Sequence, residues 1–430
     1  MPQNGMLDVI IIGGGASGMS AAISCQMLAK DHLGTPLNIL ILEKNDRVGK
    51  KVLATGNGRC NLSNQDMEML HFHSHQTDFP EKVFNSISPS IVLTFLEELG
   101  IPTVAEGTKI FPMSKNASSV VDAFRFALKE LEINVETDCD VETIQKKDGI
   151  FEVVLKDGSS YGATCVIVAC GGACAPSLGT TGDGYKWLSQ LGHKVYAPKP
   201  SIVQLVTDNS VTKALSGLKL ECELSLNSKD MLIAHQYGEV LFTDYGLSGP
   251  AVLQVSGEVS RRVKKNRLSV PMTISLKLFD ELELQRIRRE IGKRISIWGE
   301  RTLDQLLIGI LPSKISSMLL KSALARPLSI LIATLSNEDI EKIVKTLKAW
   351  KFEVLGTKSL DFAQTTIGGA DTEEFSHETM ESKIVPGLYC CGEVLDVDGD
   401  CGGYNLTWAF SSGILAGRSC VTFVEGKHEE

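Results

Sequence analysis

The distribution of apolar residues over the first 45 positions is that of a strand, a helix and a second strand. Residues 8–12 (DVIII) form an apolar run that stops at three consecutive glycines. From Ala16 to Lys30, small and apolar residues recur at helical spacing, and Leu37–Leu42 is again a mostly apolar run. Continuous runs predict strands buried on both faces, as in a parallel sheet, and the helical spacing predicts the crossover between them.

The next segments are predicted to be helical. Apolar residues recur at helical spacing over Pro80–Leu99 and Ala117–Leu131. Ser114 or Asn116 is a suitable N-cap for the second of these helices, because its side-chain oxygen accepts a hydrogen bond from the first helical turn. Residues 107–114 (GTKIFPMS), which lie between the two patterns, are expected to form a loop that faces a ligand.

Strand patterns follow, separated by two Asp-Gly turn signals. They lie at Val135, Val141–Ile144, Phe151–Leu155 and Tyr161. We expect these residues to form a three-stranded antiparallel meander. A further apolar strand, Cys165–Cys170, runs directly into paired glycines.

The second half of the chain changes from strand to helical periodicity and back. Strand-like alternation surrounds a marked turn at residues 242–250 (FTDYGLSGP), whereas Phe279–Lys351 is charged and amphipathic at helical spacing. A last strand, Gly387–Glu393, precedes an apolar helix. The predicted segments are 1–193 and 357–430 for one α/β domain, 194–276 for an inserted β domain and 277–356 for an inserted helical domain.

Composition excludes several classes of protein. A chain of 430 residues, 43% apolar and 22% charged, is typical of a globular protein with two or three domains. No apolar run approaches the roughly 18–20 residues of a membrane-spanning helix, and the start MPQNGMLD lacks a basic signal region. We therefore expect a cytoplasmic protein without a membrane span. A net charge of −9 argues against a broad nucleic-acid surface, although it leaves room for a local basic patch. We expect a small-molecule substrate and no nucleic-acid partner.

The glycines after the first strand suggest a dinucleotide site. Gly13, Gly15 and Gly18 have the G-x-G-x-x-G spacing, in which the first allows the turn, the second allows a pyrophosphate to approach and the third allows the helix to pack on the strand. Glu43 ends the second strand, where a carboxylate accepts hydrogen bonds from a ribose and repels a 2′-phosphate. FAD or NAD is therefore favoured over NADP. The alternative is an ordinary glycine-rich turn.

Two further segments are suited to a flavin. Residues 47–64 combine glycines with cations and follow the ribose-binding acid directly, which favours an anionic ligand over a solvated loop. Gly402 and Gly403 precede the last helix, whose N-terminus could direct N–H groups at the pyrimidine edge of a flavin. Glu393 or Asp396 could accept hydrogen bonds from its hydroxyl groups. A glycine turn before a core helix is the alternative.

No metal site is predicted. The 11 cysteines contain no C-x-x-C pair and are expected to be small buried residues in a reducing compartment. His71, His73 and His75 alternate along the chain, but in so polar a segment they are expected to be surface residues rather than metal ligands.

Six motifs resemble one bacterial flavoprotein family. They are GGGASG (13–18), LEKN (42–45), GKKVLATGNGRCN (49–61), GTTGDGY (179–185), FTDYGLSGP (242–250) and GEVLDVDGDCGGYN (392–405). These motifs, which span most of the chain, are similar to those of the BaiN-like or aminoacetone-oxidase-like NAD(P)/FAD-dependent oxidoreductases. The resemblance implies a Rossmann-like FAD domain of the two-dinucleotide-binding type, interrupted by a β-barrel-like domain and a small helical domain.

Motifs and resemblance together predict the site residues. The expected FAD-binding residues are Gly13, Gly15, Ala16, Ser17, Gly18, Glu43, Lys44, Lys51, Asn57, Gly58, Arg59, Cys60, Asn61, Val141, Gly171, Gly172, Gly392, Glu393, Asp400, Gly403, Tyr404 and Asn405. Tyr245 and Tyr404 are candidate proton donors, and Lys51 and Arg59 are candidates for polarising a substrate carbonyl or the flavin.

The expected activity is reduction of a carbon–carbon double bond conjugated to a carbonyl group, in a steroid or bile-acid-like enone. Because no second G-x-G-x-x-G turn exists, NADH or NADPH is expected to visit the flavin transiently as electron donor. The alternative is an FAD-dependent amine oxidase or dehydrogenase that uses oxygen, with an aminoacetone-like substrate. A third possibility is an RNA-modifying flavoprotein, against which the acidic composition argues.

Overall fold

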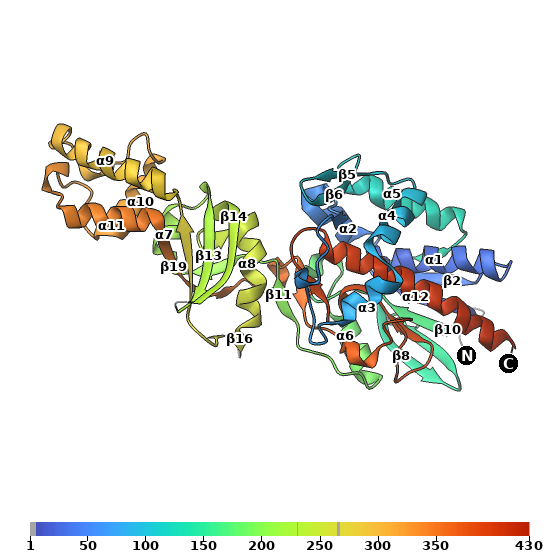
Figure 1. Cartoon of the computed structure of the whole chain (residues 1–430). Helices are drawn as coiled ribbons and strands as arrows, with labels where there is room; N and C mark the ends of the chain where they lie inside the picture. Colours follow the sequence, from blue (N-terminus) through green and yellow to red (C-terminus); the bar gives the residue numbers. More distant parts are fainter. Residues whose placement is uncertain (1–5, 230, 265–266, 430) are drawn as a thin grey trace. The chain divides into compact units, whose positions relative to one another are not determined.

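The computed structural model describes residues 6–229, 231–264 and 267–429. The chain forms two compact units (Figure 1). The first unit comprises residues 1–199 and 364–430, and the second unit comprises residues 200–363.

A seven-stranded sheet organises the first unit. Its parallel strands are β1 (Leu7–Ile12), β2 (Ile39–Leu42), β7 (Asn134–Glu136), β10 (Ser160–Val168) and β21 (Leu388–Cys390). The strands β1 and β2 are almost fully buried, as the continuous apolar runs predict for a sheet covered on both faces. The Rossmann-like α/β class expected from the sequence is confirmed.

The antiparallel part of the sheet differs from the predicted meander in two respects. β8 (Val141–Lys147), β9 (Ile150–Leu155) and β10 form the meander. Val135 lies in β7, which pairs in parallel with β2 and is not part of the meander. Tyr161 and the Cys165 run, predicted as separate strands, belong to β10, whose first half pairs with β9 and whose second half pairs with β1. Both pairings continue one extended backbone, so no turn separates them.

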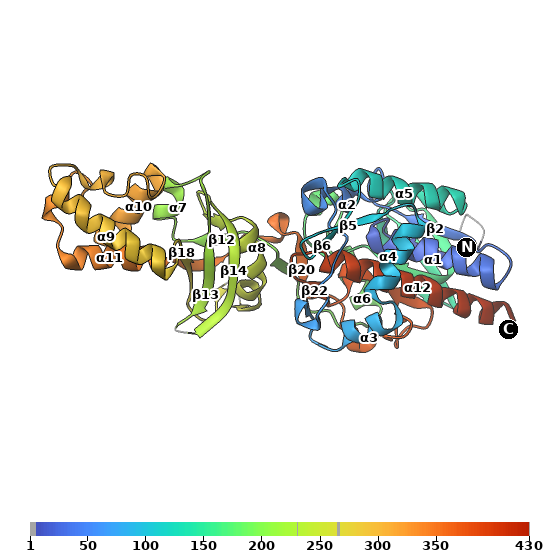
Figure 2. The ribbon, with the colours of Figure 1, turned by 45° about the horizontal axis from the view of Figure 1, so that its top comes forward.

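Helices cover the sheet of the first unit (Figure 2). They are α1 (Ala16–His32), α2 (Lys50–Ala54), α3 (Phe79–Ser86), α4 (Pro89–Glu98), α5 (Ala117–Glu130), α6 (Asp183–Gln190) and α12 (Tyr404–Glu429). The helix predicted over Pro80–Leu99 is two helices, because Pro89 begins the second and Ser88 caps it by accepting a hydrogen bond from Ile91 N. Asn116 is the N-cap of α5.

Two segments that were predicted to be loops contain regular structure. Part of residues 47–64 is helix α2, and residues 109–112 of the expected ligand-facing loop are a strand, β6. The short strands are β3 (Ser63–Asn64), β4 (Phe72–His73), β5 (Thr103–Glu106), β6 (Lys109–Pro112), β11 (Lys199–Ser201), β16 (Val263–Lys264), β17 (Arg267–Leu268), β20 (Thr365–Ile367) and β22 (Asp398–Gly399). β6 pairs with both β3 and β5, so its backbone groups are satisfied by neighbouring strands.

A closed six-stranded barrel forms the core of the second unit. Its strands are β12 (Leu205–Thr207), β13 (Lys219–Ser228), β14 (Met231–Phe242), β15 (Gly246–Ser248), β18 (Met272–Lys277) and β19 (Trp350–Thr357). Its helices are α7 (Asn209–Ala214), α8 (Pro250–Arg261), α9 (Glu281–Ile297), α10 (Ser313–Leu324) and α11 (Asn337–Lys348).

Two elements of the second unit differ from the predicted periodicity. α8 lies in a segment expected to contain only strands, and begins at Pro250 immediately after the predicted turn. β19 lies in the segment expected to be helical, yet it closes the barrel between β12 and β18. Its period-two burial, with Trp350, Phe352 and Val354 inside, is visible in WKFEVL but is too short to stand out beside α11.

The close contact of α1 with α12 depends on glycine. Both ribbon views place the two helices side by side (Figures 1 and 2). A Cβ atom added at Gly413 would lie 2.4 Å from the Ser17 carbonyl oxygen, and one at Gly417 would lie 2.1 Å from that of Ala21. Neither position leaves room for a side chain, so the C-terminal helix is held directly against the helix that follows the first glycine turn.

We predict that Gly417→Ala destabilises the protein by about 1–3 kcal/mol, because the new methyl group overpacks the contact with Ala21. The matched control is Gly426→Ala in the same helix, where nothing lies within 4 Å of the new Cβ. Thermal unfolding of the two variants measures the difference. Equal melting temperatures would show that α1 and α12 move apart without cost.

Candidate cofactor site

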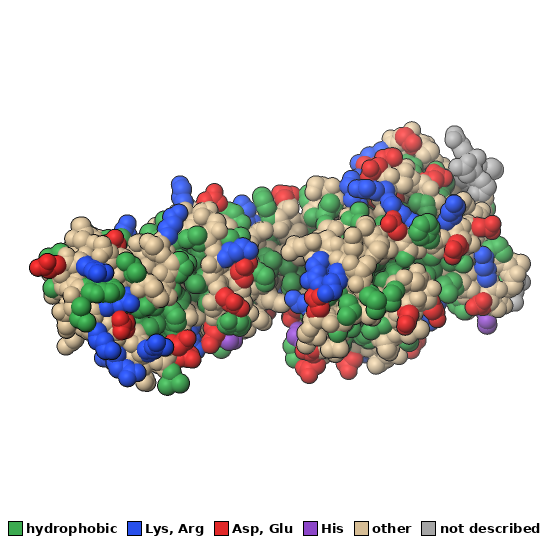
Figure 3. Space-filling model, turned by 90° about the horizontal axis from the view of Figure 1, so that it is seen from above, with side chains coloured by type: hydrophobic (Ala, Val, Ile, Leu, Met, Phe, Trp, Pro, Cys, Tyr) green, Lys and Arg blue, Asp and Glu red, His purple; other side chains and the backbone are tan. Residues whose placement is uncertain are grey.

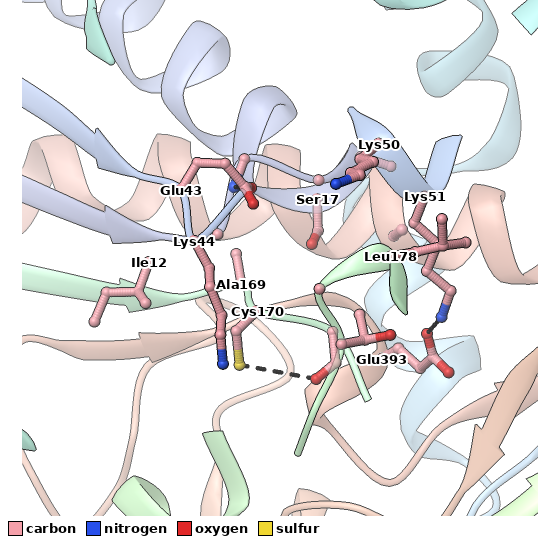
Figure 4. Close-up of a pocket in the computed structure, with 18 of the residues that line it drawn as sticks. Ile12, Ser17, Glu43, Lys44, Lys50, Lys51, Ala169, Cys170, Leu178 and Glu393 are labelled. Carbon is pink, nitrogen blue, oxygen red and sulfur yellow. Dashed lines mark hydrogen bonds and ion pairs between the residues drawn. The ribbon is translucent and has the colours of Figure 1, made fainter. Parts of the chain in front are cut away.

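A cavity lies at the carboxyl ends of β1, β2 and β10, where ligands bind in open parallel sheets (Figure 4). It holds about 1220 Å³ of empty space, part of which is open to solvent. All of its lining residues belong to the first unit. Most of them come from the first glycine turn, the end of β2, helix α2, residues 169–171 and 178–183, and the segment that begins α12. Others are Cys139, Asp140, Val141, Trp187, Gln364, Thr365, Glu393 and Val397.

The first glycine turn leaves open space over a single residue. A Cβ atom at Gly13 would lie 2.6 Å from the Ala169 oxygen, and one at Gly18 would lie 1.9 Å from the Gly13 oxygen. An added Cβ atom at Gly15, by contrast, would have no described residue within 4 Å beyond its own chain neighbours, and Gly15 lines the cavity. Gly15 is also the N-cap of α1 and provides no side-chain acceptor, so the first N–H groups of the helix lack a side-chain partner. This cradle is suited to a pyrophosphate.

Glu43 is held in place by the same turn. One of its carboxylate oxygens, Oε2, accepts a hydrogen bond from Gly14 N at 2.8 Å, and Oε1 accepts from Asn45 N and Nδ2 at 2.8 and 2.7 Å. The residue is buried but lines the cavity. Oε2 therefore has a lone pair left for a hydroxyl donor.

Lys44 stands beside Glu43 in an acidic group. Its Nζ lies 2.9 Å from Asp183 Oδ2 and 3.5 Å from Asp140 Oδ1. Burial alone would lower the pKa of Lys44, but the hydrogen bond and charge of Asp183 outweigh it and the pKa is raised. The pKa of Asp183 is lowered, because its bonds to Thr181 and Lys44 outweigh its burial. Lys44 is thus already paired with two carboxylates of the protein.

Lys51 and Glu393 form a largely buried ion pair on the cavity wall (Figure 4). The Lys51 Nζ lies 2.7 Å from Glu393 Oε2 and 3.1 Å from the Cys174 sulfur. Glu393 also accepts a hydrogen bond from Thr366 N at 2.7 Å. Burial raises the pKa of Glu393, but the Lys51 charge prevails and lowers it. Burial raises the pKa of Cys174 to about 11, so the thiol is neutral near pH 7.

Half of the predicted residues line the cavity. They are Gly13, Gly15, Ala16, Ser17, Glu43, Lys44, Lys51, Val141, Gly171, Glu393 and Asn405. The predicted residues outside this lining are Gly18, Asn57, Gly58, Arg59, Cys60, Asn61, Gly172, Gly392, Asp400, Gly403 and Tyr404.

Several residues outside the lining support the wall from behind. Gly172 and Gly392 have no room for a Cβ beside Thr366 and Ser17, respectively. Arg59 points elsewhere, because its guanidinium lies 2.6 Å from Glu106 and stacks on the Phe111 ring with the guanidinium carbon 4.4 Å from the centroid.

The structure also reveals lining residues that sequence patterns did not select. Residues 180–183 lie within the GTTGDGY motif, so that motif was a usable signal. Thr365 follows the inserted region, and no sequence motif marked it as a site residue. Its Oγ1 is buried and makes no hydrogen bond to the described residues. An acceptor or donor of a bound cofactor would satisfy it.

The alternating histidines bind the segment that leads into α12. His71 Nδ1 and His73 Nε2 lie 3.0 and 2.9 Å from the two oxygens of Asp400, and His75 Nδ1 lies 2.8 Å from Asp396 Oδ2. We expected surface residues. The side chains of His71 and His73 are mostly buried, whereas that of His75 is 56% exposed and paired with Asp396. Among the described residues, no group of three His, Cys, Asp or Glu side chains is arranged to hold a metal ion.

Asn405 joins the cavity to the segment that the histidines bind, because it lines the cavity and is hydrogen-bonded to Gly399 and Asp400. The Asn405 side chain lines the cavity, donates to Gly399 O at 2.7 Å and accepts from Gly399 N at 2.9 Å. Tyr404 stacks on His71 with 4.5 Å between ring centroids, and burial raises the pKa of Tyr404 to about 12. Asp400 and Tyr404 thus hold the loop before α12 against β4. Tyr245 lies in the second unit, between β14 and β15.

None of the helices in the described part of the chain is both long and apolar enough to span a membrane.

Residues 7–419 match the family described as "HI0933-like protein Rossmann domain". A 3-dehydro-bile acid delta(4,6)-reductase of Clostridium scindens is 32% identical over 411 residues, which cover 96% of this chain and 98% of the relative. A ribosomal RNA dihydrouridine synthase of Haemophilus influenzae is 29% identical over 410 residues, covering 94% and 96% of the two chains. The structure of a 3-ketosteroid delta1-dehydrogenase from Sterolibacterium denitrificans superposes with a TM-score of 0.51 at 13% identity, covering 98% and 100%, and thus shares the fold.

We predict that His71 stabilises the protein more at pH 6 than at pH 8.5. Burial lowers the pKa of His71, but its hydrogen bonds to Asp400 and Asp66 prevail and raise it. A raised histidine pKa contributes stability that is present below the ordinary pKa, about 6.5, and is lost as the pH rises through the folded-state value. His71→Asn keeps a donor near Nδ1 without the charge, so its melting temperature should fall further below wild type at pH 6.

The control for this experiment is His32→Asn, at an exposed position of α1. The melting temperature of His32→Asn should differ little from that of wild type at both pH values. A His71→Asn difference that is constant between pH 6 and pH 8.5 would show that the imidazolium charge adds nothing to the contact with Asp400.

Proposed function

The chain belongs to the HI0933-like Rossmann-domain family, and from that membership we propose that it reduces a carbon–carbon double bond conjugated to a carbonyl group. It is an FAD-dependent oxidoreductase, as its family and its bile-acid reductase relative support. The proposed substrate class is a steroid or bile-acid-like enone. The observation that carries this choice is the 32% identity to a 3-dehydro-bile acid delta(4,6)-reductase over 96% of the chain.

The second relative is consistent with the same reaction class. Dihydrouridine differs from uridine by two hydrogens added across a ring double bond that is conjugated to a carbonyl group. A 3-oxo steroid with a double bond at carbon 4 contains the same conjugated arrangement. Reduction of this arrangement therefore accounts for both relatives' names, whereas amine oxidation accounts for neither.

We propose that the cavity of the first unit holds FAD. Gly15 and the N-terminus of α1 would bind the pyrophosphate, and Glu43 would accept a hydrogen bond from the adenosine ribose. Thr365 and Asn405 would bind near the other end of the cofactor. When bound and reduced by the nicotinamide donor, the flavin would supply the hydride that the β-carbon of the enone gains. The proposed electron donor is NADH or NADPH, bound transiently, because the sequence contains a single G-x-G-x-x-G turn.

The charged candidates are positioning residues rather than proton donors in this proposal. Lys51 is paired with Glu393 and Arg59 with Glu106, so each cation is already neutralised by a carboxylate. Tyr404 is held in the stack with His71. Tyr245 belongs to the second unit and does not line the cofactor cavity. It stays the proposed proton donor for the substrate carbon.

A second candidate function is reduction of uridine in RNA, which the Haemophilus relative and one surface feature favour. Arg286, Arg289 and Lys293 lie on one exposed stripe of α9 and make no ion pair with the described residues. On the face shown in Figure 3, however, acidic and basic side chains are interspersed. The net charge of −9 also disfavours a broad phosphate-binding surface, so we place this function second.

We predict that Gly15→Val folds but does not retain FAD. The backbone of Gly15 has φ −81° and its Cβ direction is empty, so the protein accommodates valine, but the side chain occupies the proposed pyrophosphate position. Flavin absorbance of the purified protein and its melting temperature measure the two effects. Gly292→Val, at a helical glycine of the second unit with the same open space, should retain FAD. A fully yellow Gly15→Val protein would place the cofactor elsewhere.

The reaction class is tested by anaerobic mixing followed by substrate addition. NADH or NADPH should bleach the flavin, and 4-androstene-3,17-dione should restore its colour with loss of the conjugated absorbance. Bleaching by aminoacetone alone, with reoxidation by oxygen, would instead support the amine oxidase. Reoxidation only by a uridine-containing ribosomal RNA transcript, in a salt-dependent manner, would support the RNA function.

A further inference from the structure

The FTDYGLSGP segment forms a rigid turn that neither the barrel core nor the cofactor cavity explains. A Cβ at Gly246 would lie 2.3 Å from the Leu205 oxygen, and one at Gly249 would lie 2.5 Å from the Glu239 oxygen. The Tyr245 carbonyl accepts a hydrogen bond from Thr207 N at 3.2 Å. Both glycines are needed for close backbone contacts, and together with this bond they fix the direction in which Tyr245 leaves the barrel.

Tyr245 meets a lysine and a second aromatic ring at this point. The Lys358 Nζ lies 4.7 Å from the centroid of the Tyr245 ring and 4.3 Å from that of Phe362. Lys358 makes no ion pair with the described residues. Its position is nevertheless defined, because its backbone N–H donates to Gln204 O at 3.0 Å and its ammonium lies against two aromatic faces.

The surroundings of this cluster favour a ligand with both planar and polar parts. Phe362 is 53% exposed, which leaves much of a large apolar ring uncovered. Gln204, whose backbone carbonyl accepts from Lys358 N, has a buried side-chain Oε1 atom without a hydrogen-bond partner among the described residues. Asp244 and Asp361 are exposed and directly precede Tyr245 and Phe362 in the chain. Their negative charges disfavour an anionic ligand relative to a neutral carbonyl compound.

We propose that Tyr245, Lys358 and Phe362 form a binding site for a planar ring that carries a conjugated carbonyl group. The aromatic side chains contact the face of the ring, and the Lys358 ammonium donates a hydrogen bond to the carbonyl oxygen. This inference rests on the proposed function, for which it names three residues that select the substrate. All three residues belong to the second unit, and none of them lines the cofactor cavity.

The site is tested by ligand binding to the oxidised holoenzyme, without turnover. Lys358→Met removes the ammonium and keeps a long side chain, and Phe362→Ala removes the exposed ring. Each should raise the dissociation constant of 4-androstene-3,17-dione or of uridine about tenfold, from the loss of a hydrogen bond to a charged donor or of ring contact. The probe whose affinity falls in these variants shows whether the site takes a steroid ring or a uracil ring. FAD content should equal that of wild type.

Matched controls come from β19, the strand that precedes Lys358. Lys351→Met and Leu355→Ala change an exposed lysine and an apolar residue that is 55% exposed, and both should leave the dissociation constants unchanged. Tyr245→Phe should also preserve binding, because the ring remains, but it should lower kcat if the hydroxyl protonates the substrate. A fall in kcat with unchanged binding would separate the two roles of Tyr245.

Two results would overturn this inference. One is wild-type affinity of Lys358→Met and Phe362→Ala for both probes, and the other is the absence of binding of either probe to the wild-type holoenzyme. Neither depends on turnover. An enzyme that binds a probe through these residues but fails to reduce it would contradict the proposed function and leave the binding site intact.

Discussion

The first unit depends on backbone contacts that leave no room for a side chain. Gly13 lies against the backbone at Ala169, Gly18 lies against Gly13, and Gly413 and Gly417 lie against α1. These contacts bring the end of β1, the end of β10 and the C-terminal helix into one region, although they come from opposite ends of the chain. Because close backbone contact tolerates only glycine, a single methyl group at any of these positions would change the relative position of the walls of the cavity.

Electrostatic pairs then determine which polar groups remain available inside that cavity. Lys51 and Glu393 are 342 residues apart in sequence and neutralise each other at the wall. Lys44 is bound by acidic residues, and the Glu43 carboxylate already accepts three hydrogen bonds from the protein. Among the groups that stay available are an open glycine cradle, a free lone pair of Glu43 and the Thr365 hydroxyl, which has no partner in the described part of the chain. This arrangement is suited to a bound dinucleotide more than to charge-driven chemistry by a free lysine.

Local patterns predicted the elements that local physics determines and missed those that depend on distant partners. The β1–turn–α1 unit was predictable, because continuous apolar runs and glycine spacing are properties of adjacent residues. β19 was missed because a strand that closes a barrel is defined by its pairing with β12 and β18, which no local signal encodes. His71, His73 and His75 were expected at the surface for the same reason, since Asp396 and Asp400 approach them only after folding.

The sequence by itself determined the α/β class, the glycine cradle at the end of β1 and the family resemblance, because each is carried by residue types at fixed short spacing. Only the tertiary structure decided which side chains face the cavity. It turned Arg59 toward Glu106, placed Asp400 on two histidines and brought Lys358 between Tyr245 and Phe362. The partner of a long polar side chain is set by the desolvation and hydrogen bonding available at its position in space, which no spacing along the chain specifies.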